Sequence, residues 1–402
     1  MTIFETPVSI GSGRVALDVS ESLADHRVRR PGPLEVEELQ QRAADLELRG
    51  YGGAFFPVAR KWQAAIDAGG RGIVVANGAE SEPTSGKDAA LLQLRPHLVL
   101  DGLKATARAT GSTEVVLWLH KGAQHSRVSI ERAIVERRAA GVTDLPIRIV
   151  EGPARYLSGE STAIIRALSG GPALPHTMAV PAAISGVDGR PTLVHNIETL
   201  ARVGLLATGF EPTKSRLLTV TTPSGRVVVD TDPDETLSSL VERLGGADTS
   251  AVLLGGYGGT WHRWEDVAEQ TVRALEPLTN AGIVLVLPRS SCGIAVSAQI
   301  VQYAADSSAR QCGPCLFGLD SLAEVMQRVA SGHARRSDVA RLERISAEVA
   351  GRGACHHPDG AIRMLGSALQ VFADDLPAHR SSRRNRRCTR RHDITVPGQE
   401  AA

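Results

Sequence analysis

The sequence predicts an α/β domain, followed by a small α+β module and then a bundle of helices. In the first half of the chain, short apolar runs alternate with stretches of helical periodicity, which predicts a mainly parallel sheet with right-handed crossovers. From about residue 210, two apolar segments flank a tight turn, as in a hairpin. From about residue 290, apolar residues repeat with helical spacing over segments joined by short loops, a pattern typical of antiparallel helices.

Length and composition exclude several other classes of protein. The 402 residues suffice for two or three domains, and a formal net charge of +1 argues against a nucleic-acid-binding protein. The first residues lack the basic and apolar regions of a secretory signal, and the longest apolar runs, such as 283–287, are too short to cross a bilayer. We therefore expect a cytoplasmic protein. Its five cysteines, concentrated in the last third, are then interpreted as metal ligands or redox thiols rather than as a disulfide framework.

Residues 1–48 are predicted to form an N-terminal extension and a leading helix. An Arg/Pro-rich bend covers residues 27–33, and residues 34–48 carry apolar side chains at roughly helical spacing. The helix leads into a glycine-rich stretch.

Residues 49–209 are predicted to form the α/β domain. Its first segment, residues 49–57, has three glycines within four positions, which lets the main chain adopt positive φ angles and approach a ligand closely. Lys61 and Trp62 follow it directly. Strands are predicted at 73–76, 115–119 and 147–150, and helices at 97–109 and 126–140.

Polar residues follow the first predicted strand. Residues 77–82 leave its carboxyl end, where open α/β sheets place their ligand crevice. With the glycine-rich segment and its basic residues, this layout predicts a site for a phosphate-bearing aromatic cofactor. Residues 155–162 and 189–200 also put polar side chains at the beginnings of helices; helix capping is the alternative explanation for each alone, but three such stretches in one domain favour a ligand site.

Residues 210–288 are predicted to form the small α+β module, which has the size of ubiquitin. A hairpin of strands 217–221 and 226–229 precedes a helix at 235–244 and a strand at 251–254. The glycine-rich run 255–259 looks like a phosphate loop, but no Lys-Ser or Lys-Thr pair follows it. We therefore expect a structural turn there.

Residues 289–378 are predicted to form the helical domain, with helices at 294–305, 319–331, 338–351 and 361–372. Cys312 and Cys315 lie between the first two helices and Cys355 between the last two, so the bundle can bring three thiols together. Cysteines that survive only as structural residues are one alternative, and a thioredoxin-like dithiol of Cys312 and Cys315 is another, although the dithiol requires a preceding strand where we expect a helix. The arginine-rich tail, residues 379–402, is expected to be disordered, with Cys388 unrelated to the other thiols.

Taken together, these segments resemble the flavin-binding subunit of NADH-quinone oxidoreductase, the NuoF or 51 kDa type. The similarity lies in residues 49–62, 77–88, 156–162 and 190–200, in the glycine-rich module and in the late cysteines. It runs in order from about residue 45 to 376. The resemblance implies a Rossmann-like FMN-binding domain, a small β-grasp domain of the soluble-ligand-binding (SLBB) type, and a C-terminal helical bundle that carries a [4Fe-4S] cluster.

The resemblance also implies the functional residues. It assigns Glu82 and Glu160 to catalysis, and it assigns Cys312, Cys315 and Cys355 to the cluster. Around FMN and NADH it places Gly50, Gly52, Gly53, Ala54, Lys61, Asn77, Glu80, Tyr156, Gly159, His195 and Asn196. Backbone amides and a lysine suit a phosphate dianion, and the flavin supplies the hydride chemistry that the protein positions.

The chain departs from the family pattern around the flavin. Tyr51 replaces an arginine, Phe55 a glycine and Ala79 an aspartate, and a phenylalanine that stacks on the nicotinamide is missing near residues 180–181. The sequence therefore supports FMN binding more strongly than NADH binding.

The cluster ligands depart from the pattern as well. The first cluster cysteine of the family is Ala309 here. A four-iron cluster usually takes four thiolates, so the fourth ligand is water, Asp306 or His356, or else the cluster is three-iron or absent. Cys292, at the head of a helix, is a poor candidate for it.

The predicted function is that of an oxidoreductase subunit. Electrons pass from NAD(P)H through FMN to the iron-sulfur cluster and on to a ferredoxin-like or complex I-like electron-transfer subunit, at the periphery of a membrane complex. Two alternatives stay open: a flavoprotein that uses another electron donor, and a non-catalytic subunit that has lost NADH binding.

Overall fold

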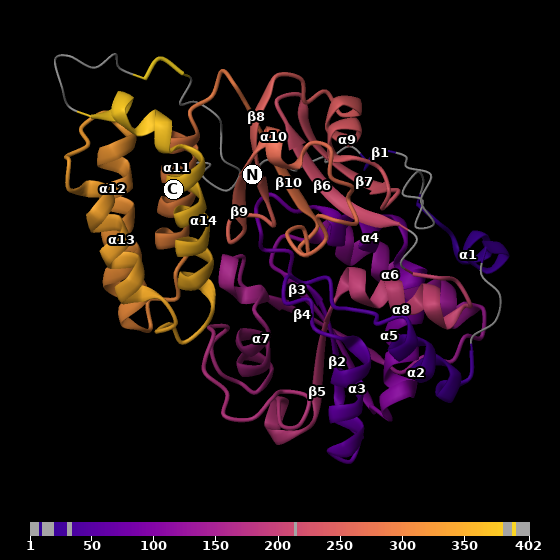
Figure 1. The fold of residues 1–402 in the computed structure, drawn as a ribbon. Helices are drawn as coiled ribbons and strands as arrows, with labels where there is room; N and C mark the ends of the chain where they lie inside the picture. The colour runs from indigo at the N-terminus through magenta and orange to yellow at the C-terminus, as the bar shows by residue number, and fades with distance from the viewer. Residues whose placement is uncertain (1–7, 10–19, 30–33, 213–214, 381–387, 391–402) are drawn as a thin grey trace.

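The computed structural model describes residues 8–9, 20–29, 34–212, 215–380 and 388–390. They form three units that pack against one another (Figure 1). An α/β unit comes first, a β-rich unit follows, and four long helices make up the third. None of the described helices is long and apolar enough to cross a membrane.

The α/β unit is built on a parallel four-stranded sheet in the order β4-β3-β2-β5. The predicted strands are all present, with slightly wider bounds. A fourth strand, β5, pairs with β2 in parallel and sets Asn196 beside Asn77. The sequence predicts only polar residues at the beginning of a helix in this segment, and the strand is an addition. The strands are β2 (Ile73–Gly78), β3 (Glu114–His120), β4 (Ile147–Gly152) and β5 (Thr192–Asn196).

Helices cover both faces of this sheet, and the tightest helix pair needs glycine. A Cβ on Gly102 would lie 1.7 Å from the carbonyl oxygen of Leu200, so α5 and α8 touch backbone to backbone. The helices are α1 (Leu23–Arg29), α2 (Val36–Asp45), α3 (Val58–Asp67), α4 (Lys87–Leu94), α5 (Pro96–Thr110), α6 (Gln124–Ala139), η1 (Tyr156–Gly159), α7 (Ser161–Leu168), η2 (Val187–Gly189) and α8 (Ile197–Ala207).

The β-rich unit is a sheet in the order β1-β7-β6-β10-β8-β9. The predicted hairpin is β6 and β7, and the predicted helix and strand are α9 and β8. The central strand β10 lies parallel to β6 and antiparallel to β8, and neither it nor β9 was predicted. The elements are β1 (Val8–Ser9), β6 (Arg216–Thr222), β7 (Gly225–Thr231), α9 (Leu237–Arg243), β8 (Thr249–Leu254), β9 (Thr260–Arg263), α10 (Trp264–Val267) and β10 (Ile283–Pro288).

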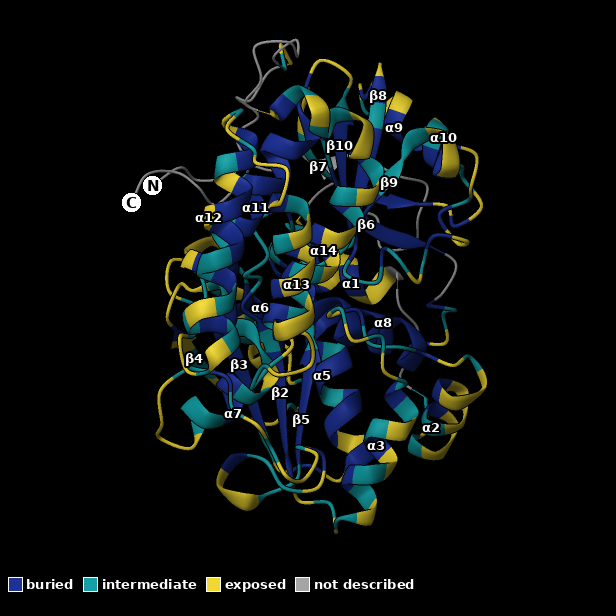
Figure 2. Cartoon of the chain, turned by 60° about the vertical axis from the view of Figure 1, so that its left-hand side comes forward, coloured by how far each residue is buried: buried dark blue, intermediate teal, exposed yellow. Residues whose placement is uncertain are grey.

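The third unit has helices at each of the four predicted positions. Figure 2 shows their buried faces turned toward one another and their exposed residues turned outward. The elements are α11 (Gly293–Asp306), η3 (Pro314–Leu319), α12 (Asp320–Ala330), α13 (Asp338–Val349), α14 (His357–Val371) and η4 (Ala373–His379). Most of the arginine-rich tail, at 381–387 and 391–402, lies outside the described residues, so the expectation of disorder there stays a prediction.

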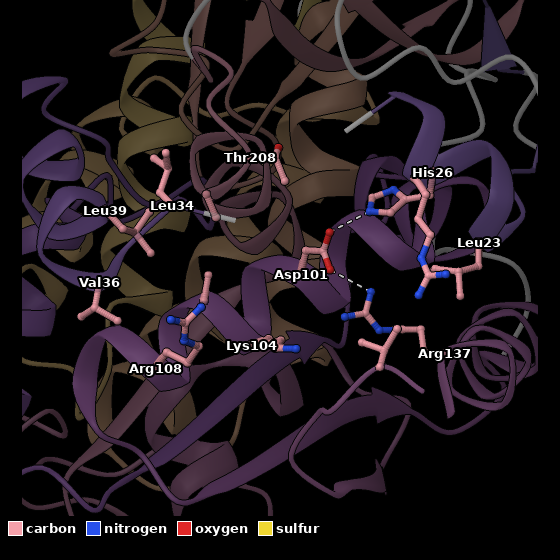
Figure 3. A pocket seen from close by; sticks show the side chains of 14 residues that line it. Leu23, His26, Leu34, Val36, Leu39, Asp101, Lys104, Arg108, Arg137 and Thr208 are labelled. Carbon is pink, nitrogen blue, oxygen red and sulfur yellow. Dashed lines mark hydrogen bonds and ion pairs between the residues drawn. The ribbon is translucent and has the colours of Figure 1, made fainter. Parts of the chain in front are cut away.

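A cavity of about 260 Å³ lies between the N-terminal helices and α5, away from the predicted functional residues (Figure 3). Its wall holds an ionic network. The buried His26 ring contacts Glu21 through Nδ1 and Asp101 through Nε2, both at 2.7 Å. Arg137 donates to the other oxygen of Asp101 at 2.8 Å. These charges anchor α1 to the body of the α/β unit.

His26 makes the free energy of unfolding depend on pH. Burial of the ring opposes its positive charge, but the hydrogen bonds with Asp101 and Glu21 outweigh this effect and raise the pKa above 6.5. A raised folded-state pKa contributes stability below the unfolded-state pKa, and this stability is lost as the pH rises through the folded-state pKa. We expect the free energy of unfolding to fall as the pH rises from about 6.5 through that raised value. Urea titrations across this range should show the fall in the wild type and a flatter profile in His26→Gln. An equally flat wild-type profile would contradict the assignment, and His125→Gln, on the exposed face of α6, is the control.

Candidate functional site

A cavity of about 600 Å³ lies where the three units meet. This volume is typical of small-molecule sites, which form preferentially at domain interfaces. The α/β unit contributes a wall that includes Gly52, Glu82, Tyr156, Gly159, Glu160 and His176. The β-rich unit contributes Tyr257 and Gly258, and the helical unit contributes Tyr303, Cys355, His357 and Arg363.

The glycine-rich segment has free backbone amides, and its Gly52 lines this cavity. It is closed at its base, where the Gly50 amide donates to the Phe56 carbonyl at 2.9 Å. It is held from the β-rich unit by Asn280, whose side chain donates to the Gly53 carbonyl at 2.9 Å. Within the described part of the chain, the amides of Gly52, Gly53 and Ala54 donate to no other group. Gly53 has φ 96°. Consecutive free amides of this kind form a concave anion site.

Lys61 on α3 is a cation with which no described carboxylate pairs, and it does not line the cavity itself. Its Nζ donates to the carbonyl oxygen of Val194 at 2.5 Å, in the middle of β5. Burial lowers the pKa of Lys61 to about 8, and no described carboxylate opposes the shift. An anion that bound beside this ammonium would relieve its desolvation.

The carboxyl end of β2 is joined to the segment before α7. The Asn77 amide donates to the Gly159 carbonyl at 2.8 Å. A Cβ on Gly159 would stand 2.5 Å from the carbonyl oxygen of Ala79, so the two backbones meet without room for a side chain. This contact fixes one wall of the cavity.

Glu82 connects two of the three units. Its carboxylate accepts hydrogen bonds from the Tyr156 hydroxyl at 3.0 Å, from Thr84 at 2.8 Å and from the Tyr257 amide at 3.3 Å. Burial raises the pKa of Glu82, although these hydrogen bonds oppose the shift. The position suits a group that holds or exchanges a proton beside a bound ligand.

The other two predicted glutamates cap helices. Glu160 accepts hydrogen bonds from the amides of Thr162 and Ala163 at the start of α7, and it also lines the cavity. Glu80 accepts hydrogen bonds from the amides of Asp88 and Ala89 at the start of α4 and does not line the cavity. The capping explanation considered for residues 155–162 therefore applies to Glu160, which also faces the cavity, whereas Glu80 caps a helix without facing it.

His195 and Asn196 lie behind the glycine-rich segment rather than in the cavity. Burial and the nearby Lys61 hold the pKa of His195 well below its usual value, and the ring accepts a hydrogen bond from the Trp62 indole at 3.3 Å. Asn196 caps α8 and donates to the carboxylate of Asp88. The Asp88 carboxylate already accepts a hydrogen bond from the Glu198 amide at the start of α8. The phosphate of a ligand must therefore bind elsewhere.

The three predicted cluster cysteines lie in one region of the helical unit, and their role as cluster ligands stays a prediction. Cys312 and Cys315 share a tight turn, in which the Cys315 amide donates to the Cys312 carbonyl at 3.1 Å. Burial raises the pKa of Cys315 to about 12, and the neighbouring Cys312 thiol adds to this effect. Cys355 also lies near enough to raise the pKa of Cys315. The preceding element is helix α11, not a strand, which argues against the thioredoxin-like use. Cys355 reaches the wall of the large cavity.

Sequence reasoning missed the aromatic cluster that closes the cavity. The ring of Tyr303 lies 5.7 Å from that of Tyr156 and 5.4 Å from that of Tyr257, and His357 lies 5.4 Å from Tyr156. Tyr257 belongs to the run 255–259, which is a turn between β8 and β9 as expected. The aromatic residue inside a glycine turn was the only available signal.

The Gly52 backbone, Glu82 and Cys355 at one cavity are the arrangement expected of a redox subunit that binds a phosphate-bearing cofactor beside a metal cluster. The profile of the Nuo51 FMN-binding domain matches residues 43–205. The profile of the NADH-ubiquinone oxidoreductase-F iron-sulfur binding region matches residues 295–379. The chain belongs to the NuoF family, the flavin-binding subunits of NADH-quinone oxidoreductase, which confirms the resemblance.

Several relatives are similar over most of the chain. The NADH-quinone oxidoreductase F 2 subunit of Rhizobium meliloti is 28% identical over 88% of this chain and 91% of its own. NADP-reducing hydrogenase subunit HndC of Solidesulfovibrio fructosivorans is 26% identical over 91% and 79%, respectively. The structure of an air-oxidized NAD+-reducing [NiFe]-hydrogenase gives a TM-score of 0.80 at 25% identity, over 90% of this chain and 66% of that one. The match therefore spans less than two thirds of the hydrogenase chain.

The departures from the family pattern leave the cavity intact. Tyr51 is buried, and its ring lies 5.4 Å from the guanidinium of Arg202 and 4.9 Å from that of Arg216. Phe55 keeps the backbone of a glycine, with φ 52°, at a conformational cost of roughly 1–2 kcal/mol. Neither side chain lines the cavity. The residues present therefore fit FMN: the amides and Lys61 suit the phosphate, and the volume accepts the ring.

We predict that flavin binding depends on pH through the ammonium of Lys61. In the flavin-free protein, Lys61 has a pKa of about 8, so its side chain loses its positive charge above that pH. We expect the dissociation constant of FMN to rise above pH 8, by up to about tenfold per pH unit. Fluorescence titration of the flavin-free chain measures this change. Riboflavin, which lacks the phosphate, is the control, and a parallel trend for both ligands would contradict the assignment.

Gly159 should tolerate no side chain. Gly159→Ala places a methyl group against the Ala79 carbonyl, and the overpacking should lower the free energy of unfolding by about 1–3 kcal/mol and weaken flavin binding. Gly366→Ala in α14 is the matched control, since no heavy atom outside its own helix lies within 4 Å of the added Cβ. Thermal melts and flavin titrations of the two variants make the comparison. Equal stability of the variants would argue against this packing.

Proposed function

We propose that the chain is an FMN-dependent oxidoreductase subunit that passes electrons from NADH or NADPH, through FMN, to an iron-sulfur cluster. The observation that carries this proposal is the shared cavity. The glycine-rich segment, Glu82 and the cluster cysteine Cys355 all line it. A flavin held there is adjacent to a cluster ligand, as transfer between the two requires.

Different residues of the chain bind the phosphate of the flavin and hold a proton beside it. FMN itself accepts a hydride and releases electrons singly when bound. The amides of Gly52, Gly53 and Ala54, together with Lys61, hold the phosphate. Glu82, whose pKa is raised by burial, holds a proton at the cavity wall beside Tyr156.

The cluster site offers three thiolates. Cys312, Cys315 and Cys355 supply them, and Ala309 provides no fourth donor. Asp306 and His356 are both exposed and accessible as a fourth ligand, and water is the remaining choice. The donor set fits a cluster with one ligand other than cysteine.

A different electron donor is the second candidate function. The segment that contributes to the cavity between α7 and β5 presents His176, Thr177 and Met178, and the family phenylalanine near 180–181 is absent. Val180 is exposed. The wall that would stack on a nicotinamide therefore lacks its ring.

Anaerobic addition of nicotinamide nucleotides to the flavin-loaded chain separates these functions. Bleaching of the flavin absorbance within seconds by NADH or NADPH supports the main proposal. A flavin that stays oxidised with both nucleotides but is bleached by a reduced ferredoxin favours the second candidate. A chain that binds flavin and reacts with none of them would be the non-catalytic subunit.

We also propose the finer assignments of domains and partners. Residues 210–288 are assigned as an SLBB β-grasp domain, supported by the order β7-β6-β10-β8-β9 around helix α9. Residues 289–378 are assigned as the iron-sulfur-binding bundle. The names of the relatives support a complex I-like or hydrogenase-like electron-transfer subunit as the partner, and with it a cytoplasmic position at the periphery of a larger complex.

A further inference from the structure

Two cysteines outside the cluster meet at the far end of the helical unit. We expected Cys388 to be unrelated to the other thiols, and this expectation is wrong. The structure places it beside Cys292 and His379, and one potential ligand atom from each residue lies within 4.8 Å of the other two. Cys292 and Cys388 also lie outside the matched iron-sulfur region, residues 295–379.

We propose that Cys292, His379 and Cys388 bind a zinc ion. The Cys292 Sγ lies 3.3 Å from the His379 Nε2. In a tetrahedral zinc site, with Zn–S bonds of about 2.3 Å and Zn–N bonds of about 2.0 Å, neighbouring ligand atoms stand roughly 3.3–3.8 Å apart. The sulfur and nitrogen are thus already at the separation that a shared ion imposes.

The chemistry of the donors selects the metal. Thiolates with an imidazole favour zinc over magnesium or calcium, which prefer oxygen ligands. Cys292 and His379 are almost completely buried, whereas Cys388 is half-buried. Water can complete the fourth position from the side of Cys388. Cys292 also caps α11, where its sulfur accepts a hydrogen bond from the Ala295 amide at 3.4 Å, so the sulfur is held at the start of this helix.

The site is separate from the cluster cysteines. Cys292 precedes the first residue of α11, whereas Cys312 follows the last residue of this helix by several positions. A helix of 14 residues spans roughly 20 Å. Metal bound at one end therefore cannot share ligands with a cluster at the other.

The ion would fasten the chain after η4 to the helical unit. Two contacts already bring Cys388 back. Its amide donates to the Ala378 carbonyl at 3.2 Å, and Arg390 forms an ion pair with Asp375 at 2.7 Å. The zinc ion adds a bond that joins the first helix of the unit to this last described segment.

Metal analysis of the full-length protein tests the proposal. After purification under reducing, anaerobic conditions, mass spectrometry of the elements should find about one zinc per chain. Cys388→Ser should lose the zinc but keep the iron, the flavin and the helical circular dichroism. Cys355→Ser is the matched variant, which should lose iron and keep zinc. Cobalt(II) added to the zinc-depleted wild type should give the intense visible bands and thiolate charge transfer of a tetrahedral site.

Three results would overturn the proposal. The first is a wild type that holds no zinc and gives no cobalt spectrum. The second is zinc that remains after Cys388→Ser, which would show that it binds elsewhere. The third is a Cys292–Cys388 disulfide in peptides from the protein prepared with its thiols blocked before digestion. Because Cys388 lies at the end of the described chain, a serine there is not expected to prevent folding.

Discussion

Lys61→Ala is expected to weaken FMN binding by about 10- to 100-fold, which corresponds to the roughly 1.5–3 kcal/mol of a hydrogen bond to a charged group. The reason is the electrostatics of the site. Lys61 donates to one carbonyl oxygen and faces no described carboxylate, so an arriving phosphate is its natural counter-charge. Flavin content after purification and the dissociation constant from fluorescence titration both measure the effect.

Arg60→Ala is the matched control. Arg60 precedes Lys61 on α3 but is exposed, and its guanidinium lies 5.9 Å from the centre of the Phe56 ring. Its removal should change FMN affinity by less than about twofold. An unchanged affinity in Lys61→Ala, or an equal loss of affinity in both variants, would show that the phosphate of FMN does not bind beside Lys61.

Cys355→Ser is expected to lose at least about nine tenths of the bound iron, because the cluster already lacks one thiolate and the variant leaves only two. Cys355 also lines the flavin cavity. Serine conserves its size, so flavin content should fall little. Iron and acid-labile sulfide, determined together with flavin in the same sample, provide the measurement.

A gain of ligand tests the same site in the opposite direction. Ala309→Cys restores the position of the missing thiolate, at the start of the turn that holds Cys312 and Cys315. Iron retention in air should rise in this variant, and Cys388→Ser should leave iron unchanged. If iron is insensitive to both Cys355→Ser and Ala309→Cys, these cysteines do not carry a cluster.

The sequence predicted the elements whose signal is local. The apolar runs of β2 and β3 and the helices of the third unit were found within a few residues of their true bounds, because burial on both faces or along one stripe dictates their composition. Strand β5 was missed because it passes directly into α8, with Asn196 both ending the strand and capping the helix. Strand β10 was seen only as an apolar run, because its place between β6 and β8 depends on pairing with segments distant in sequence.

The residues of the candidate site likewise fall into those that the sequence predicted and those that it did not. The glycine-rich segment and Glu82 could be found, since close backbone approach and the carboxyl end of a strand leave a pattern in the sequence. Tyr257, Tyr303 and His357 could not, because each joins the cavity only when the three units pack together. Glu80 has the right residue type, but its carboxylate is turned to the start of α4. The encounter of Cys388 with Cys292 likewise depends on tertiary structure alone.

The cofactor content of the anaerobically purified protein tests the central claim most directly. We expect about one FMN per chain, together with about three or four iron atoms and a similar amount of acid-labile sulfide. Flavin and iron should appear in the same chromatographic peak as the chain. A protein that contains neither, and that binds no FMN when the flavin is added, would contradict the claim that the cavity between the three units is a flavin site beside an iron-sulfur cluster.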